Sequence, residues 1–127
     1  MLEQELVHLD YFTAEMGKRK IRPTALQPLW HMGGFALGAI TALMSKEAAM
    51  ACTVAVERVI DGHYREQLES LENEPELQEK IEKFRAEEME HHDLGLKEGA
   101  EQAAAYPLLS AVIRGVTRTA IALSKKV

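Results

Sequence analysis

The segment Glu88-Met89-Glu90-His91 lies in a long charged stretch of the chain and places a carboxylate three residues before an imidazole. The same Glu-x-x-His spacing recurs near the beginning of the chain, at Glu5-Leu6-Val7-His8. Residues three apart on an α-helix lie about one turn apart on the same face. Each copy therefore predicts one carboxylate and one imidazole that point toward a common place.

A third carboxylate, Glu57, follows an apolar run over residues 50–56. A carboxylate in such surroundings is costly to desolvate unless it is paired or binds a metal ion. Two Glu-x-x-His helices and single Glu residues from two further helices make up the metal site of ferritin-like carboxylate bundles. Two alternatives remain open from the spacing: Glu57 could pair with Arg58 or another segment, and Glu87 is also a helical neighbour of His91.

The composition fits one globular domain over residues 1–127, with 46% apolar, 28% charged and only 6% aromatic residues, and it favours helix over sheet. The net charge of -5 argues against a nucleic-acid-binding protein. The single cysteine, Cys52, cannot form an internal disulfide, and its small apolar neighbours indicate a packed side chain. The acidic first residues predict neither a secretory signal nor a transit peptide.

The first helix is predicted from Met1 to about Lys18 and should end before Pro23, because the residue before a proline avoids the α region. Its apolar residues recur at helical spacing and predict a stripe that faces the core. This stripe consists of Leu2, Leu6, Leu9, Phe12 and Met16. Taken alone, Glu5 and His8 fit better as a solvated carboxylate and an imidazole at the edge of that core.

Residues 23–44 contain no Asp, Glu, Lys or Arg and carry many large apolar side chains. Pro28, His31 and the pair Gly33-Gly34 interrupt the segment, and a membrane-spanning helix needs about 20 apolar residues. The segment therefore predicts a helix that is buried or lies at an interface, with an apolar surface that needs a partner.

Three further helices follow. Ser45 is a suitable N-cap for a helix that should run to about Ser70, and Asn73 before Pro75 marks the start of another. The latter helix should bury one stripe, made of Leu77, Ile81, Phe84, Glu88 and His91. A last amphipathic helix is expected from Leu108 to Leu123.

Several segments closely resemble the demethoxyubiquinone hydroxylase family, which comprises membrane-associated di-iron monooxygenases of ubiquinone biosynthesis. These segments are Glu5–His8, Arg22–Trp30, Gly34–Gly38, Ala48–Glu57, His63-Tyr64 and Phe84–Asp93. The resemblance implies an all-α, ferritin-like helical bundle with two iron ions. By the same resemblance, the iron ligands correspond to Glu5, His8, Glu57, Glu88 and His91, and His63 and Tyr64 match a functional pair near the quinone and electron path.

The resemblance also implies an earlier helix that supplies one further glutamate ligand, and predicts that this chain is an N-terminally shortened form that starts after it. Neither Glu15, about 15 Å along the helix from Glu5, nor Glu3, on a different face, is a convincing substitute. Two alternatives stay open: the chain is a shortened gene product, or a partner supplies the missing helix.

The implied activity is hydroxylation of the demethoxyubiquinone ring with dioxygen and electrons from NADH, at the inner-membrane surface of a bacterium or mitochondrion. The implied partners are a polyprenyl quinone, a membrane surface, and either a second copy or another ubiquinone-biosynthesis protein. A catalytically impaired quinone-binding or lipid-binding subunit is the main alternative. Iron storage or peroxide scavenging would explain the ligands, but it would not explain the uncharged segment 23–44.

Overall fold

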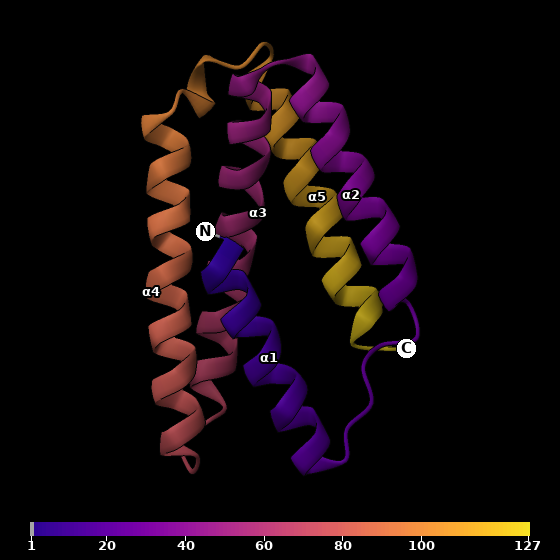
Figure 1. The fold of residues 1–127 in the computed structure, drawn as a ribbon, viewed down its shortest axis with the longest axis vertical. Helices are drawn as coiled ribbons and strands as arrows, with labels where there is room; N and C mark the ends of the chain where they lie inside the picture. The colour runs from indigo at the N-terminus through magenta and orange to yellow at the C-terminus, as the bar shows by residue number, and fades with distance from the viewer. Residues whose placement is uncertain (1) are drawn as a thin grey trace.

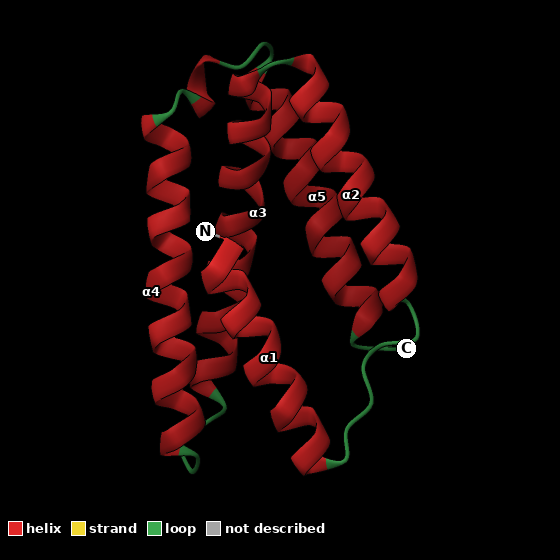
Figure 2. Ribbon diagram, viewed as in Figure 1, coloured by secondary structure: helices red, strands yellow, loops and turns green. Residues whose placement is uncertain are grey.

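The computed structural model describes residues 2–127, and within that range the secondary structure is entirely helical (Figure 2). This finding confirms the all-α prediction. The elements, in chain order, are α1 (Leu2–Arg19), α2 (Gln27–Met44), α3 (Lys46–Glu69), α4 (Pro75–Lys97), the short 3-10 helix η1 (Ala100–Gln102) and α5 (Tyr106–Ser124).

Helix α3 is the central element of the bundle, and it packs against α4 on one side and against α5 and α2 on the other (Figure 1). Helices α2 and α5 lie side by side, and the C-terminus lies near the start of α2. Helix α1 crosses beside α3 and α4, with its first turns near the middle of both. The second half of α3 therefore faces both Glu-x-x-His helices.

Small side chains allow the first half of α3 to approach its neighbours closely. Ala51 and Val54 are fully buried against Ala100 and Ala103, and a second cluster joins Cys52 to α5. At Gly95 of α4, an added Cβ would lie 2.7 Å from Val54 Cγ2 and 3.3 Å from the Met50 carbonyl oxygen. Glycine is required here because the two helices come into direct contact. The burial of Cys52 confirms that this side chain is packed.

Helix boundaries agree with the sequence at some positions and differ at others. The Ser45 hydroxyl accepts a hydrogen bond of 2.9 Å from the Ala48 backbone N–H, which confirms the predicted N-cap. The predicted Asn73 cap is wrong, since α4 starts one residue later, with Glu74 at the cap position and no side-chain hydrogen bond there. Helix α1 ends at Arg19, which confirms the predicted end near Lys18, and Lys20 after it adopts a left-handed conformation with φ of 55°.

The predicted core stripe of α1 is wrong for its first three members. Leu2, Leu6 and Leu9 are 72%, 50% and 57% exposed, whereas His8 is buried. Tyr11 and Phe12 lie on the inward side, where their rings contact Phe84 of α4. The first turns of the helix therefore direct the polar His8 side chain toward the bundle and leave their leucines exposed.

Helix α2 is covered on one narrow strip only, with Thr41 as its buried residue. Most of its large apolar side chains are exposed, including Phe35 at 80% and Leu43 at 88%, and Leu108, Val112 and Val116 of α5 are exposed as well. Of the two predicted alternatives for this segment, the buried helix is therefore excluded, and the helix with an apolar surface in need of a partner agrees with the structure. No helix within residues 2–127 has the length and hydropathy that a membrane crossing requires.

Candidate metal centre

Three helices bring the two Glu-x-x-His motifs and Glu57 together inside the bundle. Helix α1 supplies Glu5 and His8, α3 supplies Glu57, and α4 supplies Glu88 and His91. One ligand-type atom from each of Glu5, Glu57, Glu88 and His91 lies within 4.8 Å of the corresponding atoms of the other three. Glu57, Glu88 and His91 are buried, while the Glu5 side chain is 47% exposed.

The two imidazoles face the carboxylates through their Nδ1 atoms. His8 Nδ1 lies 2.8 Å from Glu88 Oε1 and 3.9 Å from Glu5 Oε2. His91 Nδ1 lies 3.1 Å from Glu5 Oε1, 3.4 Å from Glu88 Oε2 and 3.7 Å from Glu57 Oε1. Glu5 and Glu88 therefore each lie near both imidazoles, and Glu88 is the nearer of the two to His8.

Several of these buried atoms have no hydrogen-bond partner within the part of the chain described by the structure. They are Nδ1 of His8, Nδ1 of His91, Oε2 of Glu57 and Oε2 of Glu88. Buried polar atoms are nearly always satisfied, and exceptions call for an explanation such as a bound ion. The short distance between His8 Nδ1 and Glu88 brings two electron-rich atoms together without hydrogen-bond geometry. A cation between them would satisfy both, and carboxylate and imidazole donors suit iron.

Burial and mutual repulsion hold the carboxylates away from their ordinary titration range. Burial, followed by contact with Glu88 and the charges of Glu88 and Glu5, raises the pKa of Glu57 to about 10. The pKa of Glu5 is also raised, mainly by burial and by the charge of Glu88, although His8 and His91 oppose the shift. Three carboxylates at such distances need protons or a cation for charge balance.

Arg58 does not neutralise Glu57. Its Nε donates instead to His92 Nε2 at 3.1 Å, and the side chain also lines a groove on the other face of α3. The proposed Glu57–Arg58 ion pair is therefore absent from residues 2–127. The alternative between Glu87 and Glu88 is resolved as well, because Glu88 lies in the cluster whereas Glu87 contacts the far side of the His8 ring, with Oε2 2.6 Å from Nε2.

Aromatic rings close the side of the cluster that faces the α1 C-terminus. The Phe84 ring lies 4.2 Å from the His8 ring between centroids, and the Phe12 ring stacks on Tyr64 at 6.4 Å. Burial and the charges of Glu88, Glu5 and Glu57 raise the pKa of the Tyr64 hydroxyl. Tyr64 therefore keeps its proton at neutral pH beside the carboxylates.

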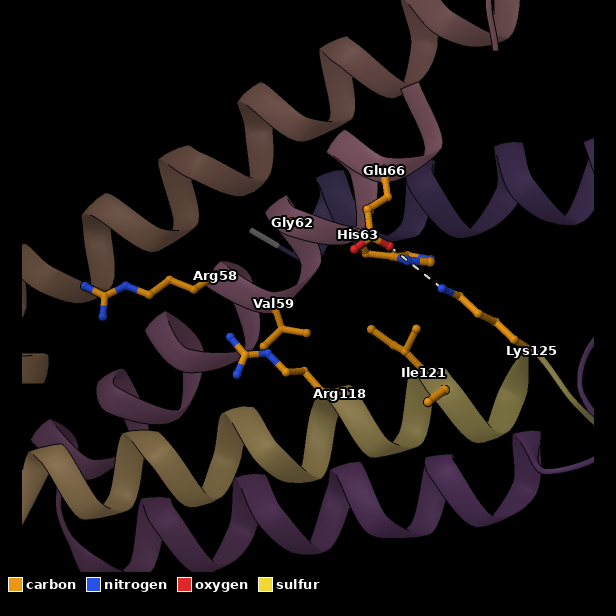
Figure 3. Close-up of a pocket in the computed structure, with 9 residues that line it drawn as sticks. Arg58, Val59, Gly62, His63, Glu66, Arg118, Ile121 and Lys125 are labelled. Carbon is orange, nitrogen blue, oxygen red and sulfur yellow. Dashed lines mark ion pairs between the residues drawn. The ribbon is translucent and has the colours of Figure 1, made fainter. Parts of the chain in front are cut away.

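His63 faces away from the carboxylates, although it adjoins Tyr64 in sequence. It lines a cavity of about 340 Å³ between α3 and α5 (Figure 3), together with Arg58, Arg118 and Lys125. Glu66 is the one acidic residue drawn there, and it pairs with Lys125 at 3.8 Å. Burial and the nearby Lys125 lower the pKa of His63, which favours the neutral imidazole. The structure thus brings the five predicted ligands together and places His63 and Tyr64 on separate sides of α3.

Sequence reasoning missed one contact of this centre. Gln4 Oε1 lies 2.6 Å from His91 Nε2, and nothing in the spacing of the motifs alone singled out Gln4. A comparison of the two motifs offered a signal, because a residue able to form hydrogen bonds, Gln4 or Glu87, directly precedes the glutamate of each motif.

The chain matches the family model described as "Ubiquinone biosynthesis protein COQ7" over residues 1–124. The chain belongs to this family. It is 51% identical over 128 residues to the 3-demethoxyubiquinol 3-hydroxylase of Rhodospirillum rubrum. The matched segment covers 100% of this chain and 60% of the relative. This membership confirms the resemblance that the motifs carried.

Relatives from eukaryotes agree. The mitochondrial NADPH-dependent 3-demethoxyubiquinone 3-hydroxylase of Homo sapiens is 51% identical over 131 residues, covering 99% of this chain and 60% of the relative. The mitochondrial 5-demethoxyubiquinone hydroxylase of Saccharomyces cerevisiae is 41% identical over 135 residues, covering 94% of this chain and 58% of the relative. The chain thus spans about 60% of the length of these COQ7-family relatives.

Proposed function

We propose that this chain carries the metal-binding core of a hydroxylase that acts on the demethoxyubiquinone ring in ubiquinone biosynthesis. The observation that carries the proposal is the buried cluster of Glu57, Glu88 and His91 with Glu5 and His8, in which both Nδ1 atoms lack a hydrogen-bond partner within residues 2–127. Membership of the COQ7 family and the names of its relatives support the same reaction.

Two iron ions are the proposed cofactor, with Glu5, His8, Glu57, Glu88 and His91 as their ligands. When bound, reduced iron supplies the activation of dioxygen. The reaction balances when one oxygen atom enters a ring C–H bond and the other leaves as water, with two electrons and two protons added. The burial of Glu57, Glu88 and His91 and the ring of Phe84 exclude water from the reacting atoms.

The proposed roles of Tyr64 and His63 follow from their positions. The protonated Tyr64 hydroxyl, on the same side of α3 as the carboxylates, can donate a hydrogen bond near the reacting ring. The neutral His63 imidazole lines two spaces. One is the groove between α3 and α5 that Arg58, Arg118 and Lys125 also line. The other is an apolar cavity of about 490 Å³ that Trp30, Met16 and Ile121 also line. His63 therefore joins a polar space to an apolar one, which suits a residue on the path of electrons or protons.

The apolar cavity and the exposed surface of α2 and α5 are the proposed route of a polyprenyl quinone. Such quinones reside in bilayers, and uncovered side chains such as Phe35, Leu43 and Val112 suit contact with a membrane surface. We place the protein at the inner-membrane surface of a bacterium or mitochondrion, where a second copy or another protein of the pathway would cover what remains exposed.

The electron donor is proposed to be a nicotinamide nucleotide. The expectation from the sequence is NADH, whereas the Homo sapiens relative is named for NADPH. Arg58, Arg118 and Lys125 around the groove supply the cations that nucleotide phosphates require.

The test is turnover by chain loaded with Fe(II), with a short-chain demethoxyubiquinone, ¹⁸O₂ and either NADH or NADPH. We expect a product that gains one ¹⁸O atom. Glu57→Ala should lose bound iron and more than about 100-fold of the turnover, whereas Glu90→Gln, an exposed carboxylate on the same α4 helix, should retain both.

Three other results would reject the assignment. Full turnover by Glu57→Ala would remove Glu57 from the centre. Quinone binding by wild-type protein that takes up no iron would identify a binding subunit, and peroxide consumption without a hydroxylated quinone would identify a scavenger.

A further inference from the structure

Each imidazole of the centre has a second hydrogen-bonding atom, Nε2, on the side away from the carboxylates. His91 Nε2 lies 2.6 Å from Gln4 Oε1, and His8 Nε2 lies 2.6 Å from Glu87 Oε2. Both contacts link α1 to α4, so each ring is held by a residue from the opposite helix. These two short hydrogen bonds are the starting point of the inference.

The chemistry of the partner atoms decides which ring nitrogen carries hydrogen. An amide carbonyl oxygen and a carboxylate oxygen only accept hydrogen bonds, so each Nε2 must donate. A neutral imidazole with hydrogen on Nε2 has a lone pair on Nδ1. The Nδ1 atoms are the ones that face Glu88 and Glu5, and neither has a hydrogen-bond partner in the described part of the chain.

The pattern is reciprocal in the sequence. Gln4 directly precedes Glu5 and lies four residues before His8, while Glu87 directly precedes Glu88 and lies four residues before His91. Each of these residues shares a helix face with the His of its own motif, yet its side chain reaches the His of the other motif. The two motifs therefore hold each other's imidazoles.

We propose that Gln4 and Glu87 are positioning residues of the metal centre, each holding the imidazole of the opposite motif with Nδ1 directed at the metal. The proposal rests on the proposed function, since it needs a metal at the cluster. Outer hydrogen bonds of this kind fix the orientation of ligating imidazoles and raise their basicity.

The two positions differ in charge, and this difference has a consequence. Glu87 offers a carboxylate to His8, whereas Gln4 offers a neutral amide to His91. Hydrogen bonds with an ionised partner are stronger than neutral ones. The Glu87 contact is therefore the stronger of the two, and its loss should weaken metal binding more than loss of the Gln4 contact.

The first measurement is the affinity of the 127-residue chain for Co(II), used as an optical probe for the iron positions. Gln4→Leu and Glu87→Leu should each weaken binding by about 10–100-fold, with the larger loss for Glu87→Leu. Glu87→Gln keeps an acceptor without the charge, and its loss should be smaller than that of Glu87→Leu. Glu90→Gln, an exposed carboxylate on α4, is the matched control and should bind as wild type does.

The second measurement separates positioning from a general structural effect. Long-range ¹H–¹⁵N NMR of the metal-free chain reports which nitrogen of each imidazole carries hydrogen. We expect hydrogen on Nε2 of both His8 and His91 in the wild type. Glu87→Leu should change the position of the ring hydrogen in His8 alone, and Gln4→Leu should change it in His91 alone. A variant that is merely unfolded would change both imidazoles together.

The outcomes distinguish this proposal from the one on which it rests. Wild-type affinity in both Leu variants would overturn the positioning role and leave the metal centre intact. Absence of Co(II) and Fe(II) binding in the wild type would reject the metal centre itself.

Discussion

The two halves of α3 contact their neighbours with opposite chemistry. In the first half, Ala51 and Val54 pack without exposed area against small apolar residues, and α3 comes into direct contact with α4 at Gly95. In the second half, Glu57 faces two further carboxylates and the His91 imidazole, and several buried atoms there lack a hydrogen-bond partner among residues 2–127.

This difference separates the part of the chain that stabilises the fold from the part that costs stability for function. Apolar contacts stabilise the first half under any solution conditions that preserve the protein. The second half is stable only when protons or a metal neutralise its carboxylates. Residues such as His8 and Glu88 lie inside the bundle because of what they bind, at the expense of the apolar packing that those positions could have provided.

The largest expected effect is that stability changes with pH in opposite directions in metal-free and metal-loaded protein. The folded-state pKa of Glu57 is about 10, above its ordinary value of 4.5, so the folded chain retains a proton that the unfolded chain releases between those values. The melting temperature of metal-free protein should therefore fall as the pH rises from 5 to 8. The melting temperature of metal-loaded protein should rise over the same range, because metal binding requires deprotonated carboxylates.

Thermal unfolding of chelator-treated and Co(II)-loaded protein across this pH range checks the prediction. Glu57→Gln is the control, because its neutral amide should flatten the metal-free curve. A wild-type metal-free melting temperature with the same pH dependence as that of Glu57→Gln would show that Glu57 is not held protonated in the folded chain.

A smaller effect is expected at the packed end. Gly95→Ala places a Cβ 2.7 Å from Val54 Cγ2, so side chains or helices must shift, at a cost of about 1–3 kcal/mol. Urea unfolding measures the loss. Gly33→Ala on α2 is the matched control, because nothing lies within 4 Å of its added Cβ and alanine favours helix, so its stability should be unchanged or raised.

Co(II) affinity measured on the same Gly95→Ala protein tests whether the two halves of α3 depend on each other. Unchanged affinity would show that the packed half and the metal-binding half are energetically separate. A parallel loss of affinity would show that the packing of α3 against α4 also positions Glu88 and His91.

The sequence predicted the parts of the site that local spacing determines. The two Glu-x-x-His motifs needed only helical periodicity, and Glu57 stood out because its neighbours are apolar. Periodicity failed on α1, where the apolar stripe led by Leu2 and Leu6 is exposed. It failed because the inward face there carries His8, and a functional site overrides the hydrophobic pattern that normally orients a helix.

Long-range pairing was the other part that the sequence could not provide. Which carboxylate of Glu87 and Glu88 enters the cluster depends on how α1 is placed against α4, and the contact of Gln4 with His91 spans 87 residues. Local rules were dependable for the Ser45 cap but not for Asn73, where the chain enters the helix one residue later and leaves the side chain without a role.

The smallest expected effect concerns that Ser45 cap, at the packed end of α3. Its hydroxyl accepts from the Ala48 N–H at 2.9 Å, so Ser45→Ala should cost about 1 kcal/mol in urea unfolding. Ser45→Asp retains an acceptor and adds a charge that favours the helix N-terminus, so it should restore most of that loss. Because Ser45 precedes the apolar half of α3, neither change should alter Co(II) affinity. A cap variant that weakened metal binding would show that fraying at the start of α3 reaches Glu57, and the two halves would then be one cooperative unit.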